Sequence, residues 1–170
     1  MTEPRAHRDD ARNSAAGVEP DPQNPVDVTE DPALDPAVDT LARTIYGEAR
    51  GERVVGKEAV AQVVMNRVRR ARRSGRHWWG NTVEEVCRKP WQFSCWNPND
   101  PNRAKVASVD ARNRTFRTCL VIAKRALRGR IDDPTEGATH YHARGTAPPW
   151  ARRRRPSAEI GRHLFYNDIE

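Results

Sequence analysis

The chain has 170 residues, with 30 lysines and arginines against 23 aspartates and glutamates, and a formal net charge of +7. This length fits one domain of ordinary size plus a tail, and it argues against a second catalytic domain. No run of about 18 apolar residues occurs, so no membrane-spanning helix is predicted. The first 20 residues also lack the apolar centre of a secretory signal.

The two signs of charge are separated along the chain. Residues 1–40 contain ten acidic and three basic side chains, a net charge of −7, and the remainder contains 27 basic and 13 acidic ones, a net charge of +14. Residues 1–34 are rich in proline and poor in large apolar residues, so they bury too little surface to offset the entropy lost on ordering. The sequence predicts a disordered acidic arm over 1–34 and an ordered, basic domain over 35–170.

Apolar periodicity predicts helices in the first half of this domain. Asp35 is suited to cap a helix and Pro36 to its first turn, and apolar residues then recur at helical spacing as far as Ile45. Gly47, which follows, predicts that the helix loosens or ends there. A second helix with an apolar face is predicted over 57–73, with arginines crowded at its C-terminal end, where they suit the helix dipole.

The second half predicts shorter elements. Residues 82–88 begin with the Thr-x-x-Glu pattern of a capping box, and 89–102 form a long loop that carries aromatic residues. The clearest amphipathic helix spans 113–128 and ends at a glycine. Residues 138–142 and 163–166 are predicted to pair as a small antiparallel sheet. The fold class is therefore α+β, mainly α.

Three cysteines, Cys87, Cys95 and Cys119, are too few for a disulfide-held miniprotein. The preferred interpretation is that they are small buried apolar residues. One disulfide in an oxidising compartment stays open as the alternative.

Glu48 is the candidate proton-transferring residue. It lies between two glycines in the segment IYGEARGE, over residues 45–52, where the end of a buried helix would hold its side chain. Burial of a carboxyl group favours its protonated form, and glycosidic bond cleavage needs such a proton donor. A single glutamate in a helix is more often an exposed, solubilising residue. The assignment of Glu48 as a catalytic residue therefore depends on the motifs around it.

Five motifs follow one another between residues 38 and about 167: ARTIYGEARGE, GKEAVAQVVMNRV, WQFSCW, ATHYH, and PPWA followed by IGRHLFY. In this order and spacing they resemble the catalytic domain of the SleB/CwlJ cell wall hydrolases, a family that includes spore cortex-lytic enzymes and phage-associated muralytic proteins. The resemblance implies a lysozyme-like, mostly helical fold with a small β element. It also implies cleavage of peptidoglycan between N-acetylmuramic acid and N-acetylglucosamine by lytic transglycosylation, without a cofactor.

The family glutamate falls on Glu48, which would donate a proton to the glycosidic oxygen and then take one from the muramyl 6-hydroxyl. Sugars bind through hydrogen bonds and through stacking on aromatic rings. The substrate-binding candidates, from the resemblance and from the aromatic loops, are Tyr46, Asn66, Trp91, Gln92, Phe93, His140, Tyr141 and Trp150.

Two other kinds of wall-cleaving site stay open. If Glu52 positioned a water molecule, the product would be a hydrolysed reducing sugar instead. A zinc amidase is the second, because His140 and His142 share one side of a strand and His163 or His77 would add a third ligand. No established zinc-ligand spacing supports it.

Two further alternatives lie outside glycosidase and zinc chemistry. Cys95 would be the nucleophile of a wall peptidase, and the basic run ARRRRP over 151–156 would contact nucleic acid. We expect instead a monomer that binds glycan strands and, through its charge, anionic envelope polymers, with no specific nucleic acid. It would act in the cell wall or periplasm, delivered by phage or particle machinery or translated from an earlier start codon.

Overall fold

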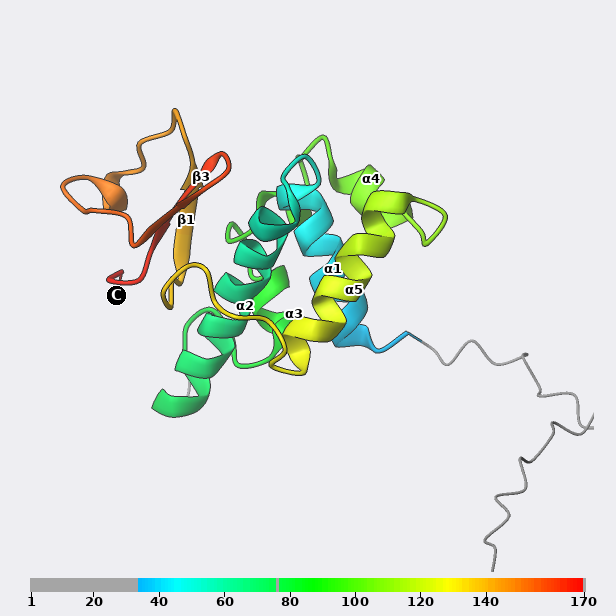
Figure 1. Cartoon of the computed structure of the whole chain (residues 1–170), viewed down its shortest axis with the longest axis horizontal. Coiled ribbons are helices and arrows are strands. Elements are labelled where there is room, and N and C mark those ends of the chain that lie inside the picture. Colours follow the sequence, from blue (N-terminus) through cyan, green and yellow to red (C-terminus); the bar gives the residue numbers. More distant parts are fainter. Residues whose placement is uncertain (1–33, 76, 170) are drawn as a thin grey trace, which may run out of the picture. The chain divides into compact units, whose positions relative to one another are not determined.

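The computed structural model describes residues 34–75 and 77–169. The predicted acidic arm over 1–34 lies outside these residues except for Leu34. The described part is mainly helical with one small sheet (Figure 1), as predicted. Its elements in chain order are α1 (Pro36–Ala49), α2 (Val54–Ser74), α3 (Val83–Arg88), the 3-10 helix η1 (Ser94–Trp96), α4 (Arg103–Ser108), α5 (Arg114–Leu127), β1 (His140–Ala143), the 3-10 helix η2 (Pro149–Ala151), β2 (Ala158–Ile160) and β3 (His163–Tyr166).

Local sequence signals define several helix ends. The Asp35 side chain accepts a hydrogen bond from the Ala37 backbone N–H at the start of α1, and the predicted capping box forms between Thr82 and Glu85 at the start of α3. α2 ends at Gly75, which adopts a left-handed conformation with φ of 80°. These contacts satisfy backbone groups that have no partner within the helix.

The prediction that Gly47 loosens or ends the first helix is wrong, because α1 continues through Gly47 and Glu48 to Ala49. Close packing explains the glycine instead. A Cβ atom at residue 47 would lie 2.4 Å from the Cβ atom of Cys95 and 2.7 Å from its sulfur. Only a residue without a side chain lets η1 approach α1 this closely.

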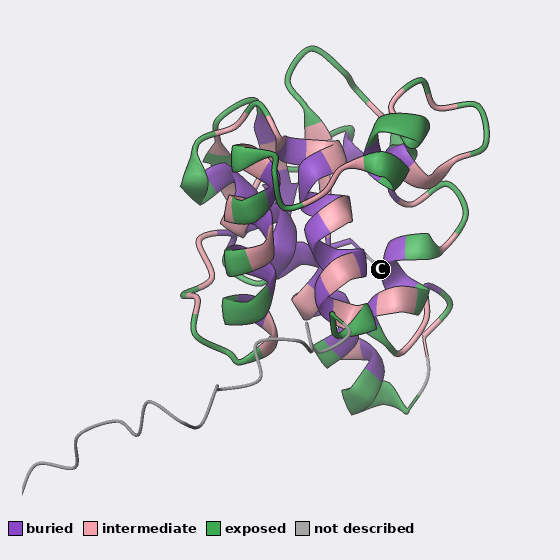
Figure 2. Cartoon of the chain, turned by 90° about the vertical axis from the view of Figure 1, so that its right-hand side faces the viewer, coloured by how far each residue is buried: buried purple, intermediate pink, exposed green. Residues whose placement is uncertain are grey.

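The larger hydrophobic core lies between α1, α2, α3 and α5. It contains buried side chains from every one of these helices, among them Leu41, Ile45, Val64, Val86 and Phe116. Figure 2 shows buried residues on the inner sides of the packed helices and exposed residues on their outer sides. None of the helices in the described part of the chain is long and apolar enough to cross a membrane.

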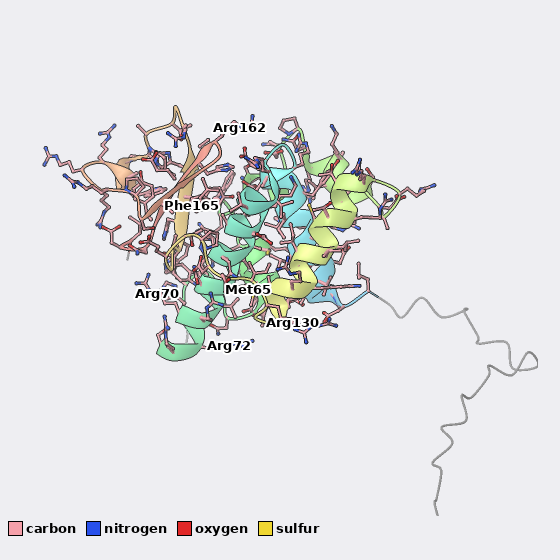
Figure 3. The ribbon with its side chains drawn as sticks, in the orientation of Figure 1. Met65, Arg70, Arg72, Arg130, Arg162 and Phe165 are labelled. Carbon is pink, nitrogen blue, oxygen red and sulfur yellow. The ribbon has the colours of Figure 1, made fainter. Side chains whose placement is uncertain are left out.

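The sheet has the order β1-β3-β2 and is antiparallel throughout. The predicted pairing of the two late segments is confirmed, with Tyr141 opposite Phe165 in the register. Phe165 packs against Ala59 and Val63 of α2 in a second core, on the side of the sheet that faces the helices (Figure 3). Burial of the Phe165 side chain contributes on the order of 2 kcal/mol to this packing.

All three cysteines of the chain lie within the described residues, and all are buried and free. Burial raises the pKa of Cys87 to about 12 and that of Cys119 to about 11. The interpretation of the cysteines as small buried residues is therefore confirmed, and none of them forms a disulfide in this structure.

Candidate active site

Glu48 lies half-buried near the C-terminal end of α1, with its carboxylate between η1 and β1. Its Oε1 atom accepts hydrogen bonds from the backbone N–H of Cys95, at 3.1 Å, and from the Ser94 hydroxyl, at 3.4 Å. Its Oε2 atom accepts one from the Tyr141 hydroxyl, at 2.9 Å. Three donors from two separate segments therefore fix one carboxylate.

The position of η1 depends on close contact with α1. The absence of a side chain at Gly47 admits Cys95, and the indole N–H of Trp96 donates to the Thr44 hydroxyl at 2.9 Å. Together these contacts hold the Cys95 backbone N–H against the Glu48 carboxylate. The segment that carries Ser94 and Cys95 is thus anchored to α1 on both counts, as a site that needs fixed geometry requires.

Tyr141 reaches Glu48 from the sheet side. Its ring packs near Phe165, with 5.6 Å between centroids, and meets the His163 ring edge-on at 5.2 Å. Burial and the nearby Glu48 carboxylate raise the pKa of Tyr141 well above its usual value. Its hydroxyl therefore stays protonated near neutral pH and serves as a hydrogen-bond donor to Glu48.

Arg67 of α2 supplies a buried positive charge beside Tyr141. Its side chain donates to the Thr139 carbonyl oxygen at 2.7 Å and to Gln92 Oε1 at 3.1 Å, and its guanidinium lies 5.2 Å from the centroid of the Phe93 ring. Burial lowers the pKa of Arg67 to about 10, so it remains charged near neutral pH. Within 34–75 and 77–169 it pairs with no carboxylate.

Two adjoining pockets lie at this site, and we refer to them together as the groove. The smaller, of about 260 Å³, contains Glu48 together with Ser94, Asn97 and His163. The larger, of about 730 Å³, extends past Trp78, Pro148 and Trp150. Both pockets are lined by the same five residues: Arg67, Trp91, Gln92, Tyr141 and His142.

Five of the eight predicted substrate-binding residues line the groove: Trp91, Gln92, His140, Tyr141 and Trp150. The other three lie elsewhere. Tyr46 is buried with its ring perpendicular to that of Phe116, and Phe93 is buried beneath Arg67. The Asn66 amide donates to Asp133 and to the Ala138 carbonyl oxygen, and it lines a different pocket. Only the first group is placed to contact a ligand that occupies the groove.

Several groups at the site are not revealed by the sequence. The Cys95 backbone N–H has no signature in the sequence, because every residue except proline carries one. Arg67 lies in the motif GKEAVAQVVMNRV, which does not by itself mark the arginine as a groove residue. Trp78 lies in an aromatic run with His77 and Trp79, and this run does not reveal which ring is exposed. His163, considered only as a metal ligand, lies in the Glu48 pocket, where burial lowers its pKa.

Glu52 has a structural contact that occupies both of its carboxylate oxygens. It accepts hydrogen bonds from Arg162 Nε at 2.8 Å and from the Arg162 backbone N–H at 3.3 Å. Arg162 lies in the turn between β2 and β3 (Figure 3). The hydrogen bond from the Arg162 side chain lowers the pKa of Glu52, so it is ionised near neutral pH. Glu52 lies just before α2, so this contact links the start of α2 to the turn between β2 and β3. Glu52 does not line the groove.

The described residues do not bring together the ligands of a metal site, and they do not favour an ionised thiol at Cys95. In the part of the chain that the structure describes, no three His, Cys, Asp or Glu side chains are grouped to hold a metal ion. His142 bonds instead to the Tyr166 hydroxyl at 3.0 Å. Burial and the neighbouring Glu48 raise the pKa of Cys95 above its usual value, which opposes formation of a nucleophilic thiolate.

Comparison with known proteins defines the family. The model of the cell wall hydrolase family matches residues 51–166, and the chain belongs to this family. Glu48 lies just before the matched stretch. The spore cortex-lytic enzyme of Bacillus cereus is 33% identical over 131 residues, which cover 75% of this chain and 43% of that protein. The corresponding enzyme of Bacillus subtilis is 31% identical over 133 residues, 74% of this chain and 35% of its own length.

Solved structures agree with this assignment. The catalytic domain of the germination-specific lytic transglycosylase SleB from Bacillus anthracis superposes with a TM-score of 0.59 at 30% identity, over 76% of this chain and 92% of that one. The catalytic domain of Bacillus cereus SleB gives the same TM-score and identity over 76% and 88%. These matches confirm the predicted fold class. The chain spans less than half the length of the spore cortex-lytic enzymes that it matches.

Proposed function

We propose that this protein cleaves the glycan strands of peptidoglycan between N-acetylmuramic acid and N-acetylglucosamine, with Glu48 as its acid and base. The observation that carries the proposal is the placement of Glu48 in a groove, with three hydrogen-bond donors on its carboxylate. The printed names of the relatives, a lytic transglycosylase and spore cortex-lytic enzymes, support the same chemistry.

In the first step, protonated Glu48 donates its proton to the glycosidic oxygen, and the bond from that oxygen to C1 of the muramyl sugar breaks. The leaving sugar departs with a free 4-hydroxyl group. Glu48 is then an anion, and the N–H of Cys95 and the hydroxyl of Tyr141 stabilise it through hydrogen bonds at 3.1 Å and 2.9 Å.

In the second step, the muramyl 6-hydroxyl attacks C1 of its own sugar, and Glu48 takes the hydroxyl proton. The product is a 1,6-anhydromuramyl end, and Glu48 is again protonated for the next cycle. No water molecule is consumed. Among the described residues that line the groove, Glu48 is the sole carboxylate, which supports this one-carboxylate route over hydrolysis by two carboxylates.

The substrate contacts depend on the residues that line the groove. The rings of Trp91, Tyr141 and Trp150 offer stacking surfaces for sugars, and the Gln92 side chain offers a hydrogen-bonding amide. We further propose that the protein acts on the cell wall from outside the cell membrane. The net positive charge of residues 41–170 would attract it to anionic envelope polymers.

The test compares release of soluble glycan fragments from purified peptidoglycan by the wild-type protein and by Glu48→Gln. Gln keeps the size of the side chain, but its amide is too weak an acid and base to exchange a proton with the substrate, so the variant should lose activity by at least about a hundredfold. Glu58→Gln is the matched control, because Glu58 forms a salt bridge with Arg125 of α5 and does not line the groove. Full activity of Glu48→Gln would overturn the proposal.

A further inference from the structure

Two large aromatic side chains are exposed on the groove. Trp91 is 78% exposed and Trp78 is 52% exposed, and both line the larger pocket. In contrast, Trp79 is fully buried, and the His77 ring stacks on it with 3.4 Å between the ring centroids. Core packing explains Trp79, but it does not explain two tryptophans whose rings face solvent.

The backbone at Trp91 is held in a conformation that is costly for a bulky residue. Trp91 has a φ of +67°, a left-handed conformation that glycine adopts freely and that bulky residues rarely adopt. Its backbone N–H donates to the Asn97 side chain at 3.2 Å, and the next N–H, of Gln92, donates to the Lys89 carbonyl oxygen at 3.1 Å. Strained residues that the surroundings maintain are concentrated at functional sites.

Trp78 extends the groove away from Glu48. It lines the larger pocket and also a third pocket of about 530 Å³, which includes Asn81, Arg88 and Pro90. Trp78 does not line the smaller pocket that contains Glu48. The surface for a long ligand therefore continues past the reacting centre by way of Trp91 and then Trp78.

We propose that Trp91, next to the reacting centre, and Trp78, farther along the groove, form a saccharide-binding platform that extends to sugar units beyond those joined by the cleaved bond. Each ring would stack on the apolar face of a pyranose, a contact that every unit of a glycan strand can make. The enzyme then prefers long strands to short oligosaccharides, because only long strands reach both rings. This inference rests on the proposed function, since it assumes that the groove binds glycan.

Binding without cleavage isolates the platform. In the Glu48→Gln protein, affinity is measured by calorimetry for glycan strands of more than about ten sugars and for a tetrasaccharide of alternating N-acetylglucosamine and N-acetylmuramic acid. Trp78→Ala should weaken binding of the long strands by roughly fivefold to tenfold and leave binding of the tetrasaccharide unchanged. Trp91→Ala should weaken long-strand binding at least as much. Val121→Ala, at an exposed position of α5 away from the groove, is the control.

The outcomes separate this inference from the proposed function. If Glu48→Gln is inactive and binds long strands, but the two tryptophan variants bind them equally well, the platform is wrong and the catalytic proposal stands. If Trp78→Ala weakens the tetrasaccharide as much as the long strands, the platform is also wrong, because Trp78 then belongs to the reacting site or supports the fold. If Glu48→Gln cleaves strands normally, the proposed function itself fails.

Discussion

Replacement of Gly47 by alanine tests whether the approach of η1 to α1 organises the active site. The added Cβ atom would lie 2.4 Å from the Cys95 Cβ atom, whereas unstrained carbon atoms approach to about 3.5–4.0 Å. The two segments must therefore separate by more than about 1 Å. Such a shift moves the Cys95 N–H and the Ser94 hydroxyl away from the Glu48 carboxylate.

This separation should change both stability and rate. Overpacking of this kind costs about 1–3 kcal/mol of unfolding free energy, although glycine to alanine within a helix normally stabilises by about 1 kcal/mol. A displacement of about 1 Å in a catalytic group lowers the rate by about a hundredfold. Gly47→Ala should therefore lower both the unfolding free energy, measured with urea, and kcat on glycan strands.

A second substitution provides the rescue. Cys95→Gly removes the Cβ and sulfur atoms that the new methyl group meets, so the double variant should regain activity relative to Gly47→Ala alone. Cys95→Gly by itself is the control for loss of the cysteine side chain. The reasoning is refuted if Gly47→Ala keeps wild-type activity and stability, or if the double variant is no more active than Gly47→Ala.

Three further predictions concern Tyr141, the three cysteines and His140. Tyr141→Phe removes one donor to Glu48 but keeps the ring, so kcat should fall by roughly tenfold to a hundredfold with little change in KM; a change in KM alone would contradict this role. The three buried thiols should resist iodoacetamide in the folded protein at pH 8, and activity should survive the treatment, whereas rapid inactivation would favour a thiol mechanism. Burial lowers the pKa of His140 to about 4, below its unfolded value of about 6.5. The unfolded chain therefore binds more protons between these values, so unfolding free energy should fall as pH drops from 6.5 towards 4. In His140→Gln the difference between the unfolding free energies measured with urea at pH 7.5 and at pH 5 should be smaller than in the wild type. An unchanged difference would show that His140 does not cause this pH dependence.

Elements with strong local signals were predictable from the sequence. Asp35 and Pro36 begin α1 as expected, the capping box begins α3, and the two late strands pair as predicted. α4 was missed because it is six residues long and buries only Val106, too few positions for a helical period to appear. β2 was missed because its three residues are too short to alternate visibly.

The candidate site was predictable in part, for reasons of geometry. Glu48, Gln92 and Tyr141 lie in motifs, and motifs identify residue types well. Asn66 and Arg67 are neighbours in α2, about 100° apart around the helix axis, so a motif that contains both does not reveal which one faces the groove. Arg67 does, and Asn66 binds Asp133 instead. That distinction needs the packed structure.

The most direct test of the account is mass spectrometry of the muropeptides that wild-type protein and Glu48→Gln release from purified peptidoglycan. We predict 1,6-anhydromuramyl products from the wild type and none from the variant. Reducing muramyl ends would keep Glu48 but require a second group that positions water. Free stem peptides, or equal products from the two proteins, would contradict cleavage of glycan strands by Glu48.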